Sequence, residues 1–502
     1  MSTRPLFSVV SVPRLFLLVA CVFIYAIAFQ GARGLYSPDE GRYTNVALGM
    51  LDSGDWLHPH LHPEVEHWSK PPLTYWAIAA SVATFGRTEF AARLPGALAF
   101  SVTILLLGRL GRRFVPLQPW LPALVYASFV FPSLAANLVT TDSLLAMWEA
   151  MQVAAFVDLW HAADARAARR ARWWLGLAAG LAFLTKGPPG LLALAACFLF
   201  AYWSEGRPGL RRAFAWDAFA LLLVVGGSWY VVVALQEPGV MRYFLVEEVV
   251  NRVASDKMRR NPEWYGAFKV YLPTLLLGSL PWLPWIMREG WRARRGGITR
   301  VRGDEGLRLL ACWLLLPLLV FGLSRSRLPL YVLPLFAPLA ILAARALAPL
   351  DTTRPWLRVA LGLWFVLLLA ARLVPAHLNV AADDRLLAKG IAQQLDPLPD
   401  EVAFVASAPR FGLRFYLHAS IERLRLPRQD AVPQSEAIEE ELGEPEGCRL
   451  LMVAPEQRVA LESELARHAI VGWRLRDVAG YALLAQIGDD CSWSPPKSPT
   501  SP

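Results

Sequence analysis

Long apolar runs constrain this chain more than any other feature of its sequence. A helix needs about 20 predominantly apolar residues to cross the hydrocarbon core of a bilayer. We identify eleven candidate runs of this kind between residues 13 and 374. They lie near residues 13–30, 90–108, 118–136, 139–160, 173–186, 188–203, 214–235, 271–287, 307–323, 328–346 and 356–374. The sequence therefore predicts a polytopic α-helical membrane protein.

The positive charge of the chain is concentrated between these runs. The net charge is +9 at neutral pH, and arginines cluster at 109–113, 166–172, 207–212 and 288–302. Basic loops mark the cytoplasmic side of a membrane protein, so this pattern argues against nucleic-acid binding. It places loop 31–89, loop 236–270 and everything after residue 375 on the outer face. We expect a multi-pass protein of a bacterial inner membrane, with its active site and C-terminal domain on the periplasmic side.

One apolar segment, Pro72–Gly86, is only marginally long enough to cross the bilayer. Counting it as a span would invert the basic loops relative to the N-terminus. We therefore interpret it as an amphipathic or re-entrant helix at the outer face.

The C-terminal part has the composition of an ordinary soluble protein. We expect a membrane domain over residues 1–376 that includes the two outer loops, a small α/β domain over 377–490, and a disordered tail over 491–502. Residues 401–407 and 448–453 resemble strands, and 455–468 resembles a helix. A disulfide between Cys448 and Cys491 is plausible if this domain faces an oxidising compartment.

Acidic residues stand at the starts of two predicted helices. Asp39 and Glu40 follow the first span, and Arg42 and Tyr43 come just after them. The helix dipole alone favours acids in a first turn. The functional interpretation is that Asp39, with Glu40 beside it, acts as a general base or charge partner at the membrane edge, supported by Arg42 and Tyr43. Asp142 begins the fourth span and is either an N-cap or a site residue.

Four cations are candidates for binding an anion. Lys70 precedes the short apolar helix, whereas Lys186, Arg325 and Arg327 lie in short outer turns where the positive-inside rule disfavours them. Such exceptions indicate an anionic partner, and a phosphate suits both lysine and arginine. The alternative for Lys70 is that it snorkels to the headgroup level of the membrane.

The first outer loop also contains His58, His60 and His62. Histidine-rich tracts bind metal ions in some proteins, which makes these three weak metal candidates. Their spacing matches no closed site, and a mobile loop accounts for them equally well. The sequence thus requires no cofactor and is compatible with a divalent metal.

An ordered set of short motifs spans roughly residues 35–340. The motifs are Asp39-Glu40-x-Arg42-Tyr43, Gly54-Asp55-Trp56, Lys70-Pro71-Pro72-Leu73-x-Tyr75-Trp76, Phe90-Ala91-x-Arg93-Leu94-Pro95, Thr141-Asp142, Leu184-Thr185-Lys186-Gly187-Pro188, Gly278-Ser279-Leu280-Pro281-Trp282 and Leu328-Pro329-x-Tyr331-x-Leu333-Pro334. Their order and spacing resemble the protein-mannosyltransferase-like glycosyltransferases of the GT-C fold. The bacterial branch of that family includes the aminoarabinose transferases that modify lipid A.

The resemblance implies a glycosyltransferase, hexosyl or pentosyl, that uses a polyprenyl-phosphate sugar donor. Its acceptor would be periplasmic (lipid A, a glycan or a protein), and transfer would normally invert the anomeric carbon. The resemblance further implies that Asp39 serves the active site and that Lys70, Arg327 and Tyr331 hold the donor phosphate. Ser69 stands where the aminoarabinose transferases usually carry a glutamate, so the resemblance does not determine which sugar is transferred.

The main alternative is a transporter or flippase of lipid-linked sugars, and a non-catalytic assembly protein is a third reading. Transporters usually contain inverted repeats with binding residues near the bilayer midplane. This sequence has no evident internal repeat, and its polar candidates gather at one predicted face. The pattern therefore favours the enzyme.

Overall fold

The computed structural model describes residues 12–62, 65–244, 246, 260–350, 354–427, 435–438, 447–468, 470, 473–487 and 491–493. The chain forms two compact units, and each is described by itself. Unit 1 comprises Met1–Gln30, Trp68–Thr74 and Arg93–Leu373. Unit 2 comprises Gly31–His67, Tyr75–Ala92 and Val374–Pro502. Most of the first outer loop therefore falls in the same unit as the C-terminal residues.

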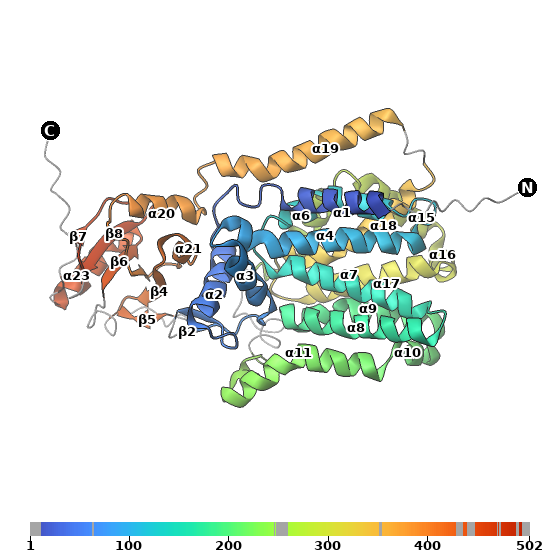
Figure 1. Ribbon diagram of the computed structural model, residues 1–502, viewed down its shortest axis with the longest axis horizontal. Coiled ribbons are helices and arrows are strands. Elements are labelled where there is room, and N and C mark those ends of the chain that lie inside the picture. The colour runs from blue at the N-terminus through green and yellow to red at the C-terminus, as the bar shows by residue number, and fades with distance from the viewer. Residues whose placement is uncertain are drawn as a thin grey trace, which may run out of the picture. The chain divides into compact units, whose positions relative to one another are not determined.

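Unit 1 is helical (Figure 1). Its first half contains α1 (Val12–Ile27), α4 (Glu89–Phe114), α5 (Leu121–Ser128), α6 (Val130–Ala135), α7 (Thr141–Trp160), α8 (Ala165–Lys186), η1 (Pro188–Leu191), α9 (Leu192–Glu205), α10 (Arg207–Ala213) and α11 (Trp216–Gln236). Its second half contains α12 (Val240–Arg242), α14 (Gly266–Gly278), α15 (Leu283–Arg295), α16 (Gly297–Gly303), α17 (Glu305–Leu323), η3 (Pro329–Leu335), α18 (Phe336–Leu347) and α19 (Pro355–Leu373).

Every predicted span coincides with helical structure, but two of them are broken. Among the described residues, five helices are long and apolar enough to cross a membrane, or six if one bent pair counts as a single span. That pair is α14 and α15, which meet at 110° where a single span over 271–287 was expected. Proline lacks the N–H that a continuing helix needs, and Pro281 and Pro284 stand at the break. The span over 118–136 is likewise divided, because Phe129 is extended between α5 and α6.

The helices of unit 1 differ in how much apolar surface they bury. Helix α7 is buried along almost its whole length and packs against α8, α9 and η3. A helix that is apolar on every side belongs in the centre of such a bundle. In contrast, only 11% of the most apolar part of Pro355–His377 is buried. Because α19 exposes Val359, Leu363 and Leu367, its outer surface suits contact with lipid.

Unit 2 combines the first loop with a six-stranded sheet. The loop region forms α2 (Asp39–Ser53), β1 (His60–His62), β2 (Val65–Glu66) and α3 (Leu73–Phe85). The C-terminal region contains η4 (Val374–His377), α20 (Asp384–Ala392), β3 (Glu401–Val405), α21 (Leu413–Leu417), β4 (Ser420–Arg425), β5 (Glu436–Ala437), β6 (Cys448–Val453), η5 (Pro455–Gln457), α23 (Arg458–Arg467), β7 (Trp473–Arg474) and β8 (Ala482–Ile487).

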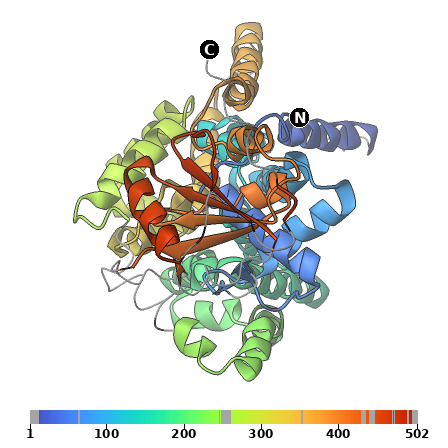
Figure 2. The ribbon, with the colours of Figure 1, turned by 90° about the vertical axis from the view of Figure 1, so that its left-hand side faces the viewer.

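The sheet has the strand order β5-β4-β3-β6-β8-β7, with β3 parallel to both β4 and β6. Its strands are the orange and red arrows of Figure 2. Alternate residues of β3 face opposite cores, as strand geometry requires. Val402 and Phe404 pack with α20 and α21, whereas Ala403 and Val405 pack with α23. The C-terminal α/β fold, its strands at 401–407 and 448–453 and its helix at 455–468 are thus confirmed in type.

Two smaller predictions also have an outcome. Cys448 and Cys491 form a disulfide, which ties β6 to the end of the chain. The segment predicted to be a short outer helix forms α3, which has 13 residues and is too short to cross a bilayer. Its location at the outer face stays a prediction. Residues 247–259 of the second outer loop and residues 494–502 of the predicted tail lie outside the described part of the chain.

Candidate active site

The predicted site residues divide between the two units. Unit 2 contains Asp39, Glu40, Arg42 and Tyr43, which we call the loop acid cluster, and the three histidines. Unit 1 contains the candidates for binding phosphate and their neighbours: Lys70, Asp142, Lys186, Arg325, Arg327 and Tyr331.

Asp39 and Glu40 both lie in the first turn of α2, but their environments differ. The Glu40 side chain is almost fully buried, and its carboxylate accepts hydrogen bonds from Arg33 Nη1 at 2.5 Å and Nη2 at 3.2 Å. The backbone N–H of Tyr36 donates to the same carboxylate at 2.9 Å. Glu40 therefore fixes the fold of the loop that precedes the helix.

Asp39 is the accessible acid of the pair. Its side chain is 43% exposed, and Oδ1 accepts a hydrogen bond from Arg42 Nη2 at 2.5 Å, one helical turn later. Arg42 also lies over the Tyr43 ring, and Tyr43 packs against Tyr75 with ring centroids 5.8 Å apart. The guanidinium thus holds one side of the Asp39 carboxylate while the rest of that group stays open to a substrate.

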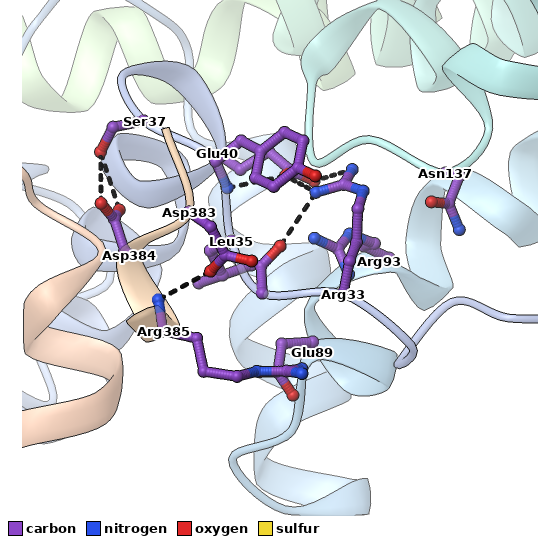
Figure 3. Close-up of polar contacts among 12 residues, drawn as sticks. Arg33, Leu35, Ser37, Glu40, Glu89, Arg93, Asn137, Asp383, Asp384 and Arg385 are labelled. Carbon is purple, nitrogen blue, oxygen red and sulfur yellow. Dashed lines mark hydrogen bonds and ion pairs between the residues drawn. The ribbon is translucent and has the colours of Figure 1, made fainter. Parts of the chain in front are cut away.

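Residues from the C-terminal region hold the loop that carries these acids. Ser37 donates from Oγ to the Asp384 carboxylate, at 2.7 and 3.0 Å, and its N–H donates to Ala382 O at 2.9 Å (Figure 3). The N–H of Asp384 donates in turn to Leu35 O at 2.9 Å. The fully buried Asp384 pairs with Arg410 at 2.5 Å. We call these contacts of Leu35 and Ser37 with Ala382 and Asp384 the strap. Because Ser37 lies two residues before Asp39, the strap sets the position of Asp39.

A second network supports the start of the same loop. Tyr416 Oη accepts a hydrogen bond from the N–H of Leu35 at 2.8 Å and lies 3.0 Å from Glu89 Oε1. Arg385 pairs with that same Glu89 carboxylate at 2.6 Å (Figure 3). The sequence patterns identified Asp39 and Glu40 but gave no sign of these partners, because residues 384, 410 and 416 are more than 300 positions away along the chain.

Gly41 permits the close packing that brings α2 to this strap. A Cβ atom added at Gly41 would lie 2.5 Å from the backbone N of Gly412 and 2.9 Å from Asp384 Oδ2. Both distances are shorter than ordinary van der Waals contacts. The glycine of the Asp39-Glu40-Gly41 sequence is therefore required by packing within unit 2.

The histidine candidates do not gather into a metal site. His58 Nδ1 lies 2.8 Å from Asp55 Oδ2, while His60 and His62 lie on β1. Among the described residues, no group of three or more histidines, cysteines or acids has a geometry that would hold a metal ion.

In unit 1, Asp142 and Lys186 form a buried ion pair. Their side chains are only 7% and 5% exposed, and Lys186 Nζ donates to Asp142 Oδ1. Thr140 caps α7 by accepting from the N–H of Asp142, and its hydroxyl donates to Asp142 Oδ2 at 2.8 Å. Lys186 Nζ also lies 4.4 Å from the centroid of the Tyr331 ring. The N-cap interpretation of Asp142 was wrong, because Thr140 is the N-cap of α7. Its role as a site residue stays a prediction.

Two buried polar residues of this region escaped the sequence analysis. Glu149 lies on α7 two turns after Asp142, is 1% exposed, and interacts electrostatically with Lys186 and Asp142. Tyr271 of α14 packs beside Tyr331 and interacts with Arg327. An ionisable residue inside a predicted span is a functional candidate by default, so Glu149 offered a detectable signal.

Arg327 is a buried cation that binds backbone carbonyl groups. Its Nη1 donates to Asn261 O at 2.8 Å and to Glu263 O at 2.7 Å, and its Nη2 donates to Gly322 O at 3.1 Å. No carboxylate of the described residues lies within salt-bridge distance of it. Carbonyl groups orient a guanidinium without neutralising its charge, so Arg327 keeps a positive potential in a buried place.

Lys70 lies two residues after a tryptophan that packs in an aromatic cluster. Trp68, two residues earlier, packs against Trp229 and Phe244 at centroid distances of 6.0 and 6.3 Å. Lys70 Nζ donates to the carbonyl of Ser69 at 2.6 Å and is half-buried. Arg325, by contrast, is exposed. The predicted cations thus include the buried Arg327, the half-buried Lys70 and the exposed Arg325.

Comparisons with known proteins place these features in a family context. A family model described as dolichyl-phosphate-mannose-protein mannosyltransferase matches residues 69–230. An undecaprenyl phosphate-alpha-4-amino-4-deoxy-L-arabinose arabinosyl transferase of Pseudomonas fluorescens (strain Pf0-1) is 36% identical over 331 residues, which is 63% of this chain and 56% of that protein. The corresponding transferase of Pseudomonas aeruginosa (strain LESB58) is 35% identical over 343 residues, covering 66% and 59%. The chain thus spans less than two thirds of these relatives' length.

Solved structures match over more of the chain. ArnT from Cupriavidus metallidurans bound to undecaprenyl phosphate superposes with a TM-score of 0.75 at 21% identity, covering 96% of this chain and 100% of that one. The mycobacterial arabinofuranosyltransferase AftD superposes with a TM-score of 0.55 at 12% identity, covering 94% of this chain and 40% of that one. The class is therefore defined: this chain is an integral membrane protein of the GT-C fold. Within that class, its resemblance to the protein-mannosyltransferase-like glycosyltransferases and their bacterial aminoarabinose branch is confirmed.

Proposed function

We propose that this protein is a glycosyltransferase that moves a sugar from a polyprenyl-phosphate donor to an acceptor hydroxyl on the periplasmic side of the bacterial inner membrane. The observation that carries the proposal is the environment of Asp39, an accessible carboxylate beside a buried and fully engaged one. The relatives named above are arabinosyl transferases with an undecaprenyl phosphate donor, which favours a pentose and that carrier lipid. Lipid A is the acceptor that the family resemblance favours.

Asp39 acts as the general base in this proposal. The acceptor oxygen attacks the anomeric carbon of the donor, and the bond between that carbon and the phosphate oxygen breaks. The hydroxyl proton passes to Asp39, and the polyprenyl phosphate leaves as the anion with its full complement of oxygen atoms. Attack opposite to the leaving group inverts the anomeric carbon. Arg42 keeps the carboxylate oriented, and an oriented base contributes about 10²–10⁴-fold in rate.

Cations of unit 1 bind the donor phosphate in this proposal. Arg327 has a buried charge that backbone carbonyl groups leave unneutralised, so a phosphate would balance it. Lys70 would add a compact charge, with Arg325 at the surface and Tyr331 as a hydroxyl donor. Charge that develops on the leaving phosphate is stabilised most by groups that are already in place. Asp142 supports this set by holding Lys186 beneath Tyr331.

The test is a transfer assay with the purified full-length chain in nanodiscs. We would supply undecaprenyl phosphate-4-amino-4-deoxy-L-arabinose and a panel of other polyprenyl-phosphate sugars, with lipid A as acceptor. Asp39→Asn should lower kcat/KM by about 10²–10⁴-fold, and Lys70→Ala should raise the donor KM by about 10-fold or more. Asp52→Asn is the matched control, because Asp52 is an exposed acid on the same helix that pairs with Arg414 at 2.9 Å.

Each outcome has a separate meaning. Transfer by wild type and by Asp52→Asn, but not by Asp39→Asn, supports the class and the base together. Transfer that persists in Asp39→Asn would remove the base from the proposal. Absence of transfer from every donor, while donor lipid is moved between the leaflets of a vesicle, would favour the flippase instead.

A further inference from the structure

Unit 1 contains a cavity that the proposed reaction does not use. It has a volume of about 400 Å³, within the usual size range of small-molecule sites. Its walls come from the C-terminal ends of α4, α7 and α18, from α9, and from the start of α17. These helix ends lie at or beside the arginine clusters 109–113 and 288–302, which the positive-inside pattern predicts to be cytoplasmic.

The cavity has an apolar floor. Phe114, Phe156, Phe200 and Leu309 line it, and each is at most 6% exposed. Trp160 adds a fifth apolar surface, and its indole N–H donates to Glu305 Oε1 at 2.7 Å. Such a floor suits the first carbon atoms of a lipid chain.

The rim of the cavity contains two ion pairs and is partly exposed. Arg113 Nη2 lies 3.5 Å from Glu305 Oε2, with side chains 53% and 38% exposed. Arg345 Nη2 donates to Asp304 Oδ2, with side chains 18% and 31% exposed. The rim therefore presents two guanidinium groups and two carboxylates to whatever enters.

His161 lies between the members of the first pair and does not change this balance. Its Nδ1 accepts a hydrogen bond from Arg113 Nη2 at 3.0 Å, so the proton of the neutral ring is on Nε2, which faces Glu305 Oε1 at 3.5 Å. Partial burial lowers the pKa of His161, against the attraction of Glu305, and Arg113 and Arg212 lower it further. The lining thus carries two positive and two negative charges at neutral pH.

A ligand that matches this rim must carry both signs of charge. A purely anionic headgroup would face the carboxylates of Asp304 and Glu305, and a purely cationic one would face the two arginines. A headgroup with a phosphate and a primary ammonium offers a partner of opposite charge to both arginines and to both carboxylates of the rim. Phosphate accepts hydrogen bonds from guanidinium groups, and an ammonium donates to carboxylates.

We propose that this cavity binds the zwitterionic headgroup of a lipid, with its phosphate at Arg113 and Arg345 and its primary ammonium at Glu305 and Asp304. Phosphatidylethanolamine of the membrane has this chemistry. A polyprenyl-phosphate amino sugar, the donor class of the proposed function, carries the same two charges. The proposal itself is independent of sugar transfer, and only this choice between the two sources rests on the proposed function.

The test measures lipid binding by native mass spectrometry of the delipidated full-length chain. Phosphatidylethanolamine should bind about tenfold more tightly than phosphatidylglycerol, which lacks the ammonium, and than phosphatidylcholine, whose trimethylated nitrogen cannot donate. The double variant Arg113→Gln/Arg345→Gln should lose about tenfold in affinity for phosphatidylethanolamine. Arg169→Gln/Arg170→Gln is the matched control, because it removes the same charge from exposed positions of α8 outside the cavity.

A second variant separates loss of binding from loss of folding. Glu305→Gln keeps an acceptor for the indole of Trp160 but removes one ammonium partner. It should bring the affinity ratio of phosphatidylethanolamine to phosphatidylglycerol close to one, a change of preference that an unfolded protein would not produce.

Other outcomes would overturn the proposal. Phosphatidylglycerol binding as tightly as phosphatidylethanolamine in wild type would mean an anionic-lipid site. Unchanged affinity in the arginine double variant would place the lipid elsewhere. A competition experiment separates the two sources. If polyprenyl-phosphate amino sugar displaces phosphatidylethanolamine when it is present at the lower concentration of the two, the lipid-linked sugar is the ligand. If phosphatidylethanolamine stays bound, the phospholipid is the ligand. Since no sugar transfer is measured, failure here leaves the proposed enzyme untouched.

Discussion

The first turn of α2 and the first turn of α7 both carry an acid with a cationic partner, but the two regions differ in exposure. In α2, Asp39 is 43% exposed and pairs with an arginine on its own helix. In α7, Asp142 is 7% exposed and pairs with Lys186 from another helix. A local pair orients an accessible group, whereas a pair between helices joins parts of the fold. Similar sequence patterns thus support different tasks.

The comparison extends to the neighbour of each acid. Beside Asp39, the buried Glu40 is satisfied by two nitrogens of Arg33 and by a backbone N–H. Two turns after Asp142, Glu149 is equally buried, and neither carboxylate oxygen has a hydrogen-bond partner among the described residues. Burial of an acid without hydrogen bonds is costly. Glu149 is therefore a buried acid whose carboxylate lacks hydrogen bonds, and Lys186 is the cation that interacts with it.

The largest expected effect separates Asp39 from Glu40. Asp39→Asn should lower kcat/KM by about 10²–10⁴-fold, because the amide cannot accept the acceptor's proton. Its melting temperature should stay within a few degrees of wild type, since the side chain is half exposed. Glu40→Gln, assayed at a temperature where it is folded, should lower kcat/KM by less than about tenfold. The reverse order of the two variants would make Glu40 the base.

The next effect concerns the buried pair of unit 1. Lys186→Met removes the cation that serves both Asp142 and Glu149, and should destabilise the protein by about 3–5 kcal/mol. Thermal unfolding in detergent measures the loss. Adding Asp142→Leu to Lys186→Met should restore part of that stability, because the buried carboxylate is then absent. A double variant less stable than either single one would show that the ion pair is not the stabilising contact.

The sequence was sufficient for some of these features and insufficient for others, for physical reasons. Apolar length locates spans, and motif order locates Asp39, Lys70 and Asp142, because both are local properties of the chain. The division of labour between Asp39 and Glu40 depends on Arg33 and on packing that adjacency does not reveal. The strap from Asp384 to Ser37 joins residues 347 positions apart, and no local pattern encodes it. The break between α14 and α15 was detectable from its prolines.

A smaller effect tests the structural role of Glu40. Glu40→Gln retains an acceptor for one guanidinium hydrogen bond but removes the negative charge that pairs with the buried Arg33, at a cost of about 2 kcal/mol. Protection of residues 33–37 against hydrogen exchange should fall accordingly. The matched variant Asp39→Asn should leave that protection unchanged, because Arg42 lies near the surface of the helix. Equal loss in the two variants would contradict the distinction between the acids.

The smallest expected effect is a pH dependence of the strap in unit 2. Burial raises the pKa of Asp384 to about 6, although Arg410 and the hydroxyl of Ser37 lower it in part. An unfolded aspartate titrates near 3.9, so between about pH 4 and pH 6 the unfolded chain loses this proton while the folded protein keeps it. The contribution of Asp384 to stability is therefore most favourable at low pH and declines as the pH rises through 6.

Between about pH 5 and pH 7 the decline amounts to about 1 kcal/mol. Protection factors of α20 amides in hydrogen exchange, corrected for intrinsic rates, should fall about fivefold more over this interval in wild type than in Asp384→Asn. The opposite result is that α20 of the wild type becomes better protected than α20 of Asp384→Asn as the pH rises. It would mean that the effect of Arg410 on the pKa of Asp384 outweighs the effect of burial, and that Asp384 is ionised throughout this pH range. Asp384 and Arg410 would then be a buried ion pair like Asp142 and Lys186. The difference between the two regions would be limited to the exposed acid, Asp39.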